Sequence, residues 1–479
     1  MDDAVPISEA DEQALLDSID RWLTRKVAPV AAKYEQADEY PTELVDDMCE
    51  MGLFGALIEP QYGGLGLPAT TYSRIVARIS EEWMSLTGFF NSHLMMALIV
   101  QKFGTQAQKE HWLPRFATGE LRGGLALTEP DAGTDLQGIR TVARRASGPG
   151  GDVYRITGSK LWITNSIEGQ VLAVLVKTDP DSEPRHRGMS MLITPTRDRT
   201  TGELRGGLAL TEPDAGTDLQ GIRTVARRDG DVYRMTGSKL WITNSIEGQV
   251  LAVLVKTDPD AQPRHRGMTM LIAMTRDLAT GAEAPGVSRG KKLPKLGYRG
   301  IDTGGISFDA APVDARLGLV GGEEGKGFLM ATGGLEIGRV NVAARGVGIA
   351  RRALKEAVAY AQIRQTMGKP IAQHQAIQLK LGEMAAKTRA AELLVEDAAR
   401  AYDRGGRVDM EAGMAKWFAT ETAFEVATES MRIHGANGYS KEYPIERLYR
   451  DVPLMMIGEG TNEMQRIIIA RQLIARNPV

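Results

Sequence analysis

The sequence has few residues of the kinds that form disulfides or hold metals. Cys49 is the only cysteine, so no intrachain disulfide can form, and this suits a reducing compartment. The six histidines are scattered, with neither an HExxH motif nor a Cys/His cluster. Zinc catalysis is therefore not expected, and we predict no metal site.

The chain also lacks long apolar runs and an excess of one charge. Its longest purely apolar run, 94–100, is far shorter than the roughly 20 residues that span a bilayer. The acidic start is followed by neither an apolar nor an Arg-rich stretch, so we expect a cytoplasmic protein without signal or transit peptide. The net charge of −3 does not favour a nucleic-acid partner.

A long internal repeat is the most unusual feature present. Residues 118–145 recur without change as 201–228, and 152–198 recur as 231–277 with six differences. Solenoid repeats are shorter and need about three copies, so this is one tandem duplication of part of a domain. The chain of 479 residues therefore contains about 400 residues of distinct sequence.

The periodicity of the apolar residues divides the chain into three parts. Residues 8–115 have helical spacing, and so do 327–364, 371–404, 408–434 and 461–475. Between them, 153–157 alternates and 171–176 is a short apolar run, both typical of strands, with 304–308 expected to close the β region. This order predicts a helical domain over 1–120, a β domain over 121–325 and a helical bundle over 326–479. The β domain would hold copy one (121–202), copy two (204–281) and closing strands (282–325).

Glu459 is the strongest catalytic candidate. It lies between Gly458 and Gly460, where the backbone can approach a ligand closely. In an apolar pocket its pKa would rise, which suits a general base near neutral pH. The alternative is an acidic residue that only stabilises the start of the helix after Thr461.

Other motifs have an equally simple structural interpretation. The segment 128–135 offers hydroxyls and loop amides for an anion or a flavin edge, or forms an ordinary turn. Trp162 and Thr164 would share a strand face and stack on a cofactor, or pack in the core. Arg339 and Arg364 could bind phosphate or solvate a helix. The stretch 321–327 is not a phosphate loop, because Gly327 stands where Ser or Thr is needed.

Taken together, these motifs resemble the acyl-CoA dehydrogenase family over nearly the whole chain. They include PQYGGLG at 60–66, LTEPDAGTD at 127–135, GSKLWITN at 158–165, KLGYRG at 295–300, RQTMGKPI at 364–371, HGANGY at 434–439 and GEGTNEMQR at 458–466. The resemblance implies an N-terminal all-α domain, a middle β-barrel-like domain (here partly duplicated) and a C-terminal four-helix bundle.

The resemblance also implies a reaction. An FAD-dependent acyl-CoA dehydrogenase removes an α-proton and a β-hydride from an acyl-CoA thioester and forms a trans-2-enoyl-CoA. Glu459 would be the α-proton base, and its backbone N–H would help to polarise the thioester carbonyl. The expected partners are the acyl-CoA, an electron-transferring flavoprotein as acceptor, and further copies of the chain in a homotetramer or homodimer.

Carried over by position, the resemblance implies contacts for the cofactor and the substrate. FAD would contact Leu125, Thr128, Thr134, Trp162 and Thr164, or their second-copy equivalents Leu208, Thr211, Thr217, Trp241 and Thr243. It would also contact Arg364, Gln365, Thr366, His374, Gln375, Arg432, His434, Gly435, Ala436, Thr461, Asn462 and Glu463. The substrate would contact Glu336, Arg339, Gly460 and Arg471.

Several positions depart from the family pattern. Some relatives carry the base just before the position of Arg339, where this chain has Gly338, so Glu459 has no rival. Gly458 replaces a common Tyr, which would widen the acyl pocket, and Met367 replaces the usual Phe.

The duplication leaves the working copy open. Copy one, copy two or a hybrid could build the flavin site, with copy two slightly favoured by its short Asp229-Gly230 turn. Two alternatives to the dehydrogenase remain: an acyl-CoA oxidase that uses oxygen, and a flavin-poor, inactive protein that serves only in interactions.

Overall fold

The computed structural model describes most of the two helical parts of the chain and the strands between them. The described residues are 7–121, 123–126, 142–148, 151–157, 171–179, 189–195, 206–209, 225–229, 232–242, 250–257, 268–274, 287–289, 293–301, 304–309, 311–314, 320–322 and 327–479. All statements on structure below concern these residues.

The N-terminal part is helical, as its periodicity predicts. The helices are α1 (Glu9–Trp22), α2 (Ala31–Ala37), α3 (Thr42–Glu50), α4 (Ala69–Trp83), α5 (Ser85–Phe103) and α6 (Gln106–Ala117), with a π-helical turn at Leu23–Val27 and 3₁₀ turns at Leu53–Gly55 and Pro60–Tyr62. Thr105 and Gln108 form a capping box at the start of α6, which satisfies two free backbone donors. Helix α5 is buried on nearly every side, and it forms the centre of this part.

The two copies of the repeat form the same strand pairings. Copy one contributes β1 (Gly123–Ala126), β2 (Val142–Gly148), β3 (Gly151–Thr157), β4 (Val171–Lys177) and β5 (Met189–Pro195). Copy two contributes β6 (Gly206–Ala209), β7 (Val225–Asp229), β8 (Val232–Ile242), β9 (Val250–Lys256) and β10 (Met268–Met274). Strands β1 and β4 pair in parallel with Gly123 opposite Val171, and β6 and β9 pair in the same register with Gly206 opposite Val250.

The remaining strands are divided between the copies. In the sheet order β11-β12-β8-β7-β9-β10-β4-β2-β3-β13, strands β10 and β4 join the copies where Met270 meets Leu175. Strands β11 (Val287–Arg289) and β12 (Gly304–Asp309) extend copy two, whereas β13 (Ala311–Asp314) pairs with β3 of copy one. The expectation that 304–308 ends the β region was wrong, because β13 follows it. Barrel-like closure stays a prediction.

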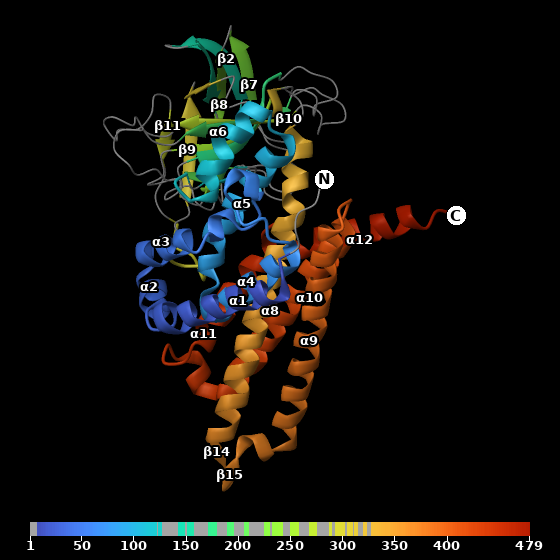
Figure 1. Ribbon diagram of the computed structural model, residues 1–479. Coiled ribbons are helices and arrows are strands. Elements are labelled where there is room, and N and C mark those ends of the chain that lie inside the picture. Colours follow the sequence, from blue (N-terminus) through green and yellow to red (C-terminus); the bar gives the residue numbers. More distant parts are fainter. Residues whose placement is uncertain are drawn as a thin grey trace.

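The C-terminal helices pack into a bundle below the sheet (Figure 1). They are α8 (Gly327–Ile363), α9 (Gln375–Asp403), α10 (Asp409–His434), α11 (Ile445–Ile457) and α12 (Asn462–Arg476), with the two-residue strands β14 (Gln365–Thr366) and β15 (Lys369–Pro370) after α8. Helix α11 has no counterpart among the predicted helices, since Pro453 lies inside it and a Gly/Pro-rich segment precedes it. Helix α12 extends away from the bundle to the C-terminus.

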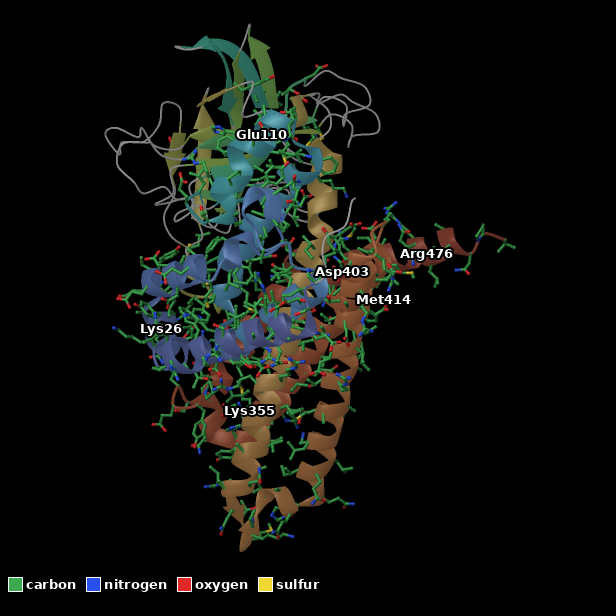
Figure 2. The ribbon with its side chains drawn as sticks, viewed as in Figure 1. Lys26, Glu110, Lys355, Asp403, Met414 and Arg476 are labelled. Carbon is green, nitrogen blue, oxygen red and sulfur yellow. The ribbon has the colours of Figure 1, made fainter. Side chains whose placement is uncertain are left out.

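The N-terminal helices are attached to this bundle at the start of α4. The backbone N–H groups of Ala69 and Thr70 donate to the carboxylate of Asp403 at 2.5 and 3.1 Å. Asp403 belongs to the end of α9 (Figure 2), so a side chain of the bundle caps a helix of the N-terminal part. Helices α4 and α5 also lie against α8. This three-helix contact positions the site described next.

None of the helices in the described part of the chain is both long and apolar enough to cross a membrane.

Candidate active site

Glu459 lies in the tight turn between α11 and α12. Its φ angle is 56°, and that of the following Gly460 is 84°, so two consecutive residues are left-handed. For a residue with a Cβ this conformation costs about 1–2 kcal/mol. Non-glycine residues held in it often mark functional sites, because the surrounding structure must enforce the strain.

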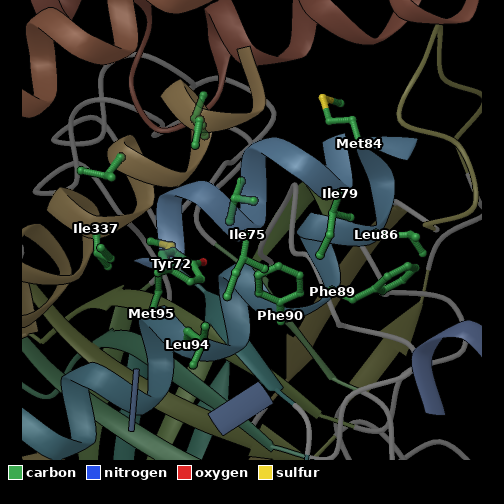
Figure 3. Close-up of a cluster of buried hydrophobic side chains, with 14 of the residues drawn as sticks. Tyr72, Ile75, Ile79, Met84, Leu86, Phe89, Phe90, Leu94, Met95 and Ile337 are labelled. Carbon is green, nitrogen blue, oxygen red and sulfur yellow. The ribbon is translucent and has the colours of Figure 1, made fainter. Parts of the chain in front are cut away.

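The carboxylate of Glu459 is held against α5 and α8. A Cβ atom placed on Gly338 of α8 would lie 3.0 Å from Glu459 Oε2 and 2.9 Å from Met95 Sδ. Asn91 of α5 hydrogen-bonds to the carboxylate. Met95 also belongs to a cluster of buried apolar side chains that includes Phe90 and Leu94 of α5 and Ile337 of α8 (Figure 3). The carboxylate therefore faces a largely apolar wall with one amide donor.

Burial raises the pKa of Glu459 above its ordinary value of 4.5. Three cations act in the opposite direction and favour the ionised form: Arg345, Arg339 and Lys416. Because burial dominates, Glu459 loses its proton closer to neutral pH than an exposed glutamate does. This suits a base that must accept a proton from a weakly acidic carbon.

A series of hydrogen-bonded polar side chains connects α8 to α4 and to the 293–301 loop near this site. Asn341 Nδ2 donates to the Tyr72 hydroxyl at 2.7 Å, and Arg345 Nε donates to Asn341 Oδ1 at 2.6 Å. Arg345 Nη1 reaches the Tyr298 hydroxyl at 3.4 Å and lies over its ring. The helical spacing of Gly338, Asn341 and Arg345 puts them on one face of α8, which could have been read from the sequence. Their partners on α4 and in the 293–301 loop could not.

Several of the residues predicted to contact the cofactor lie around a pocket at the C-terminal end of α8, which is called the second pocket because it is separate from the site around Glu459. It has a volume of about 510 Å³. Among the predicted cofactor residues, its lining includes Arg364, Thr366, His374, His434, Gly435 and Ala436. Gly435, with φ 60° and ψ −135°, has a backbone conformation that is essentially restricted to glycine. Gln365, Gln375 and Arg432 do not line this pocket, and Arg432 instead pairs with Glu429.

The predicted substrate residues divide into two groups. Arg339 is buried and pairs with Asp409 at 3.2 Å. Burial, and then the charge of Asp409, raises the pKa of the half-buried Glu336. Both lie on α8 near Gly338, whereas Arg471 is exposed in the second half of α12. The structure therefore brings Glu336, Arg339 and Gly460 near one region and leaves Arg471 apart from it.

Three predicted cofactor residues follow Glu459, and two of them have structural roles. The Thr461 hydroxyl accepts from the backbone N–H of Met464 and caps α12. Asn462 is buried, with its amide bonded to Thr420, Glu421 and Lys416. Glu463 is exposed, and hydrogen bonds lower its pKa.

Part of the prediction falls on the β region. Thr128, Thr134, Trp162, Thr164, Thr211, Thr217 and Thr243 lie outside the described residues. Leu125 lies in β1, Leu208 in β6 and Trp241 in β8. Which copy contacts a flavin therefore stays a prediction.

Family models match all three parts of the chain. The acyl-CoA dehydrogenase N-terminal domain matches residues 9–120, the middle domain matches 124–205 and again 207–311, and the C-terminal domain matches 325–474. The chain belongs to the acyl-CoA dehydrogenase family. It is therefore an oxidoreductase of the class that acts on CH–CH bonds, and the family's proteins are flavoproteins.

Similar proteins match along almost the whole of this chain. An acyl-CoA dehydrogenase of Bacillus subtilis is 33% identical over 97% of this chain and 98% of its own. A 3-(aryl)acrylate reductase of Clostridium sporogenes is 33% identical over 94% of this chain and 95% of its own. The structure of butyryl-CoA dehydrogenase from Megasphaera elsdenii superposes with a TM-score of 0.74 at 28% identity, covering 99% and 100% of the two chains.

Proposed function

We propose that this member of the family is an FAD-dependent acyl-CoA dehydrogenase that uses Glu459 as its base. The observation that carries the proposal is the position of the Glu459 carboxylate, which lies beside Gly338 of α8 and Met95 of α5. Family members with the base on the earlier helix place it beside this same point. A base at position 338 and a base at position 459 would therefore place the carboxylate at the same location in the fold.

The residues of the second pocket fit one half of FAD. Arg364 supplies a cation for the pyrophosphate, and the Gly435 backbone leaves space for close approach. Tyr360, Ile371 and Ile377 give apolar contact for an adenine ring. When bound, FAD supplies the acceptor for the hydride. The residues of this chain bind it, exclude water and remove the proton.

The two sites on one chain are too far apart to share one FAD. The segment of α8 from Gly338 to Tyr360 is about 33 Å long at 1.5 Å per residue. The pocket is lined by residues around β14 and β15, and these strands lie at the end of the bundle remote from the sheet (Figure 1). That length exceeds the reach of FAD from flavin ring to adenine. We therefore propose that each flavin is shared between two copies, in a homodimer or homotetramer.

The reaction begins with an ionised Glu459. Its carboxylate takes the proton from the carbon next to the thioester carbonyl, and its backbone N–H donates to that carbonyl oxygen. The developing enolate charge then meets a donor already in place. Hydride loss from the next carbon leaves a trans-2-enoyl-CoA. Gly458 in place of a bulkier residue leaves room for a branched acyl group, and an electron-transferring flavoprotein is the proposed acceptor.

The test is the absorbance of the purified protein. Bound flavin near 450 nm that is bleached by an acyl-CoA supports the proposal, and a screen of acyl-CoA thioesters identifies the chain length. Glu459→Gln should keep the flavin and abolish bleaching, whereas a bleached variant would show that the base is elsewhere. Protein without stoichiometric flavin would favour the inactive alternative, and rapid reoxidation by oxygen alone would favour the oxidase.

Arg364→Ala tests the second pocket separately. Loss of a cation beside the pyrophosphate should lower the flavin content and leave the helical circular dichroism unchanged. Exposed Arg389 on α9 offers a matched control, and Arg389→Ala should retain flavin. An unchanged flavin content in the Arg364 variant would remove this pocket from the proposal.

A further inference from the structure

Lys416 is buried in the middle of α10, among alanines. Its side chain is 0% exposed, and Ala412, Ala415 and Ala419 occupy the same buried side of the helix. Lysine is almost never fully buried without a partner, because removing its charge from water is costly. The residue therefore needs a specific explanation.

All three acceptors of Lys416 belong to the turn that carries Glu459. Nζ donates to the backbone carbonyls of Met456 and Gly460, at 3.2 and 3.0 Å, and to Asn462 Oδ1 at 2.8 Å. Met456 precedes Glu459 by three residues, and Asn462 follows it by three. One ammonium group thus fixes both sides of the turn, while Gln465 holds the carbonyls of Glu459 and Gly460 from α12.

These three acceptors are neutral, so hydrogen bonding leaves the charge of Lys416 uncompensated. In the described part of the chain no carboxylate oxygen lies within 4.0 Å of Nζ. Among the acidic groups that act on it from further away, Glu459 has the largest effect, ahead of Glu463 and Glu421. Arg339 of α8 acts against them. The principal counter-charge of Lys416 is therefore the proposed catalytic base.

A purely structural link between α10 and the turn would not need a charge. Neutral donors could bond the same carbonyls, and a well-packed apolar side chain at such a site is often at least as stable as a buried ion. A cation, however, does two things at once here. It bonds to the backbone on both sides of Glu459, and it favours the ionised form of the Glu459 carboxylate.

We propose that Lys416 is a positioning residue for the reaction, which holds the Glu459 turn in place and stabilises the ionised carboxylate through its own charge. This inference rests on the proposed function. It assigns a role to a residue that none of the motifs contains.

The inference has a consequence for the pH dependence. Burial lowers the pKa of Lys416 to about 7, so its charge increases as the pH falls below that value, where Glu459 most needs help to ionise. Besides Lys416, three groups lower the pKa of Glu459. Arg339 and Arg345 of α8 do so through their positive charge, and Asn91 of α5 does so by donating a hydrogen bond. Removing Lys416 leaves those groups and takes away one cation that favours the ionised carboxylate, so the pKa of Glu459 should rise.

The experiment measures flavin reduction in the flavin-loaded enzyme from pH 5.5 to 9. The substrate is the acyl-CoA that bleaches wild-type flavin fastest. The acid limb is the low-pH part of the curve that relates the rate of flavin reduction to pH. In Lys416→Met, this limb should shift to higher pH by at least one pH unit, with about tenfold slower flavin reduction on the limb and partial recovery of the rate at high pH. Lys416→Gln keeps two donors but no charge, so its acid limb should move as well while its flavin content stays normal. Lys355→Met, an exposed lysine on α8 (Figure 2), should change neither quantity.

The outcomes separate the two proposals. Wild-type enzyme that no acyl-CoA reduces would refute the proposed function, and the role of Lys416 with it. If the wild type is reduced and neither variant moves the acid limb, only the role of Lys416 is wrong. Should Lys416→Met fail to fold, the comparison of Lys416→Gln with wild type decides the matter in the same way.

Discussion

The left-handed backbone of Glu459 can be tested by a pair of substitutions that differ only in the presence of a Cβ atom. Glu459→Ala and Glu459→Gly both remove the carboxylate, so they change charge and burial alike. Alanine keeps the strain of φ 56°, which costs about 1–2 kcal/mol. Glycine removes that strain but loses about 0.5–1 kcal/mol through the greater freedom of the unfolded chain. The glycine variant should therefore be more stable than the alanine variant by about 1 kcal/mol.

The matched control is the same pair at Asp397, an exposed position inside α9. There the backbone is helical, and glycine should be less stable than alanine by about 1 kcal/mol. The sign of the difference should thus reverse between the two positions. Urea unfolding of the flavin-loaded protein, with thermal midpoints as a second measure, provides the comparison. If glycine is the less stable residue at both positions, the turn stores no strain at Glu459 and the reasoning fails.

Three further predictions concern the same site and the repeat. Gly338→Ala would place a Cβ 3.0 Å from Glu459 Oε2 and 2.9 Å from Met95 Sδ. It should therefore slow flavin reduction and lower the free energy of unfolding, measured with denaturant, by about 1–3 kcal/mol. Unchanged kinetics of flavin reduction would mean that the carboxylate lies elsewhere. Since the folded pKa of Glu459 is raised, its contribution to stability is present below about pH 4.5 and is lost as pH rises through the folded pKa. Glu459→Gln should therefore become more stable relative to wild type as pH rises from 4 to 8, and a constant difference in melting temperature would contradict this. Deleting residues 118–200 joins Ala117 to Thr201 and leaves one intact copy, so the shortened protein should bind at least as much flavin; loss of flavin would show that both copies are needed.

Much of this arrangement follows from local sequence. The helical periodicity predicts α8, α9, α10 and α12 to within a few residues, because apolar residues recur at spacings of three and four in each of them. Glu459 stands out between two glycines, and the motif residues around Arg364 and His434 do meet in one pocket. In each case neighbouring residues carry the whole signal.

What could not be predicted depends on contacts between distant segments. Lys416 is 43 positions from Glu459, counted from 416 to 459. No residue near Lys416 in the sequence indicates that its ammonium group bonds to the Glu459 turn. A lysine within an alanine-rich face is unusual, and that was the available signal. Helix α11 was missed since proline normally ends a helix, yet Pro453 is accommodated within it.

The identity of the two copies also gives the folding chain a choice. Strands β4 and β9 have the same sequence, VLAVLVK, and so do β1 and β6, GGLA. The pairing of β1 with β9 would form the same backbone hydrogen bonds as the observed pairing with β4. Chain entropy separates them only slightly: closing a loop from Gly123 to Val250 instead of Val171 lengthens it from 48 to 127 positions and costs about 0.9 kcal/mol more. The native assignment of strands thus depends on packing against α5 and the bundle. Before those contacts form, a sizeable share of refolding chains should pair a strand with the wrong copy and must separate it again, which should appear as a slow refolding phase.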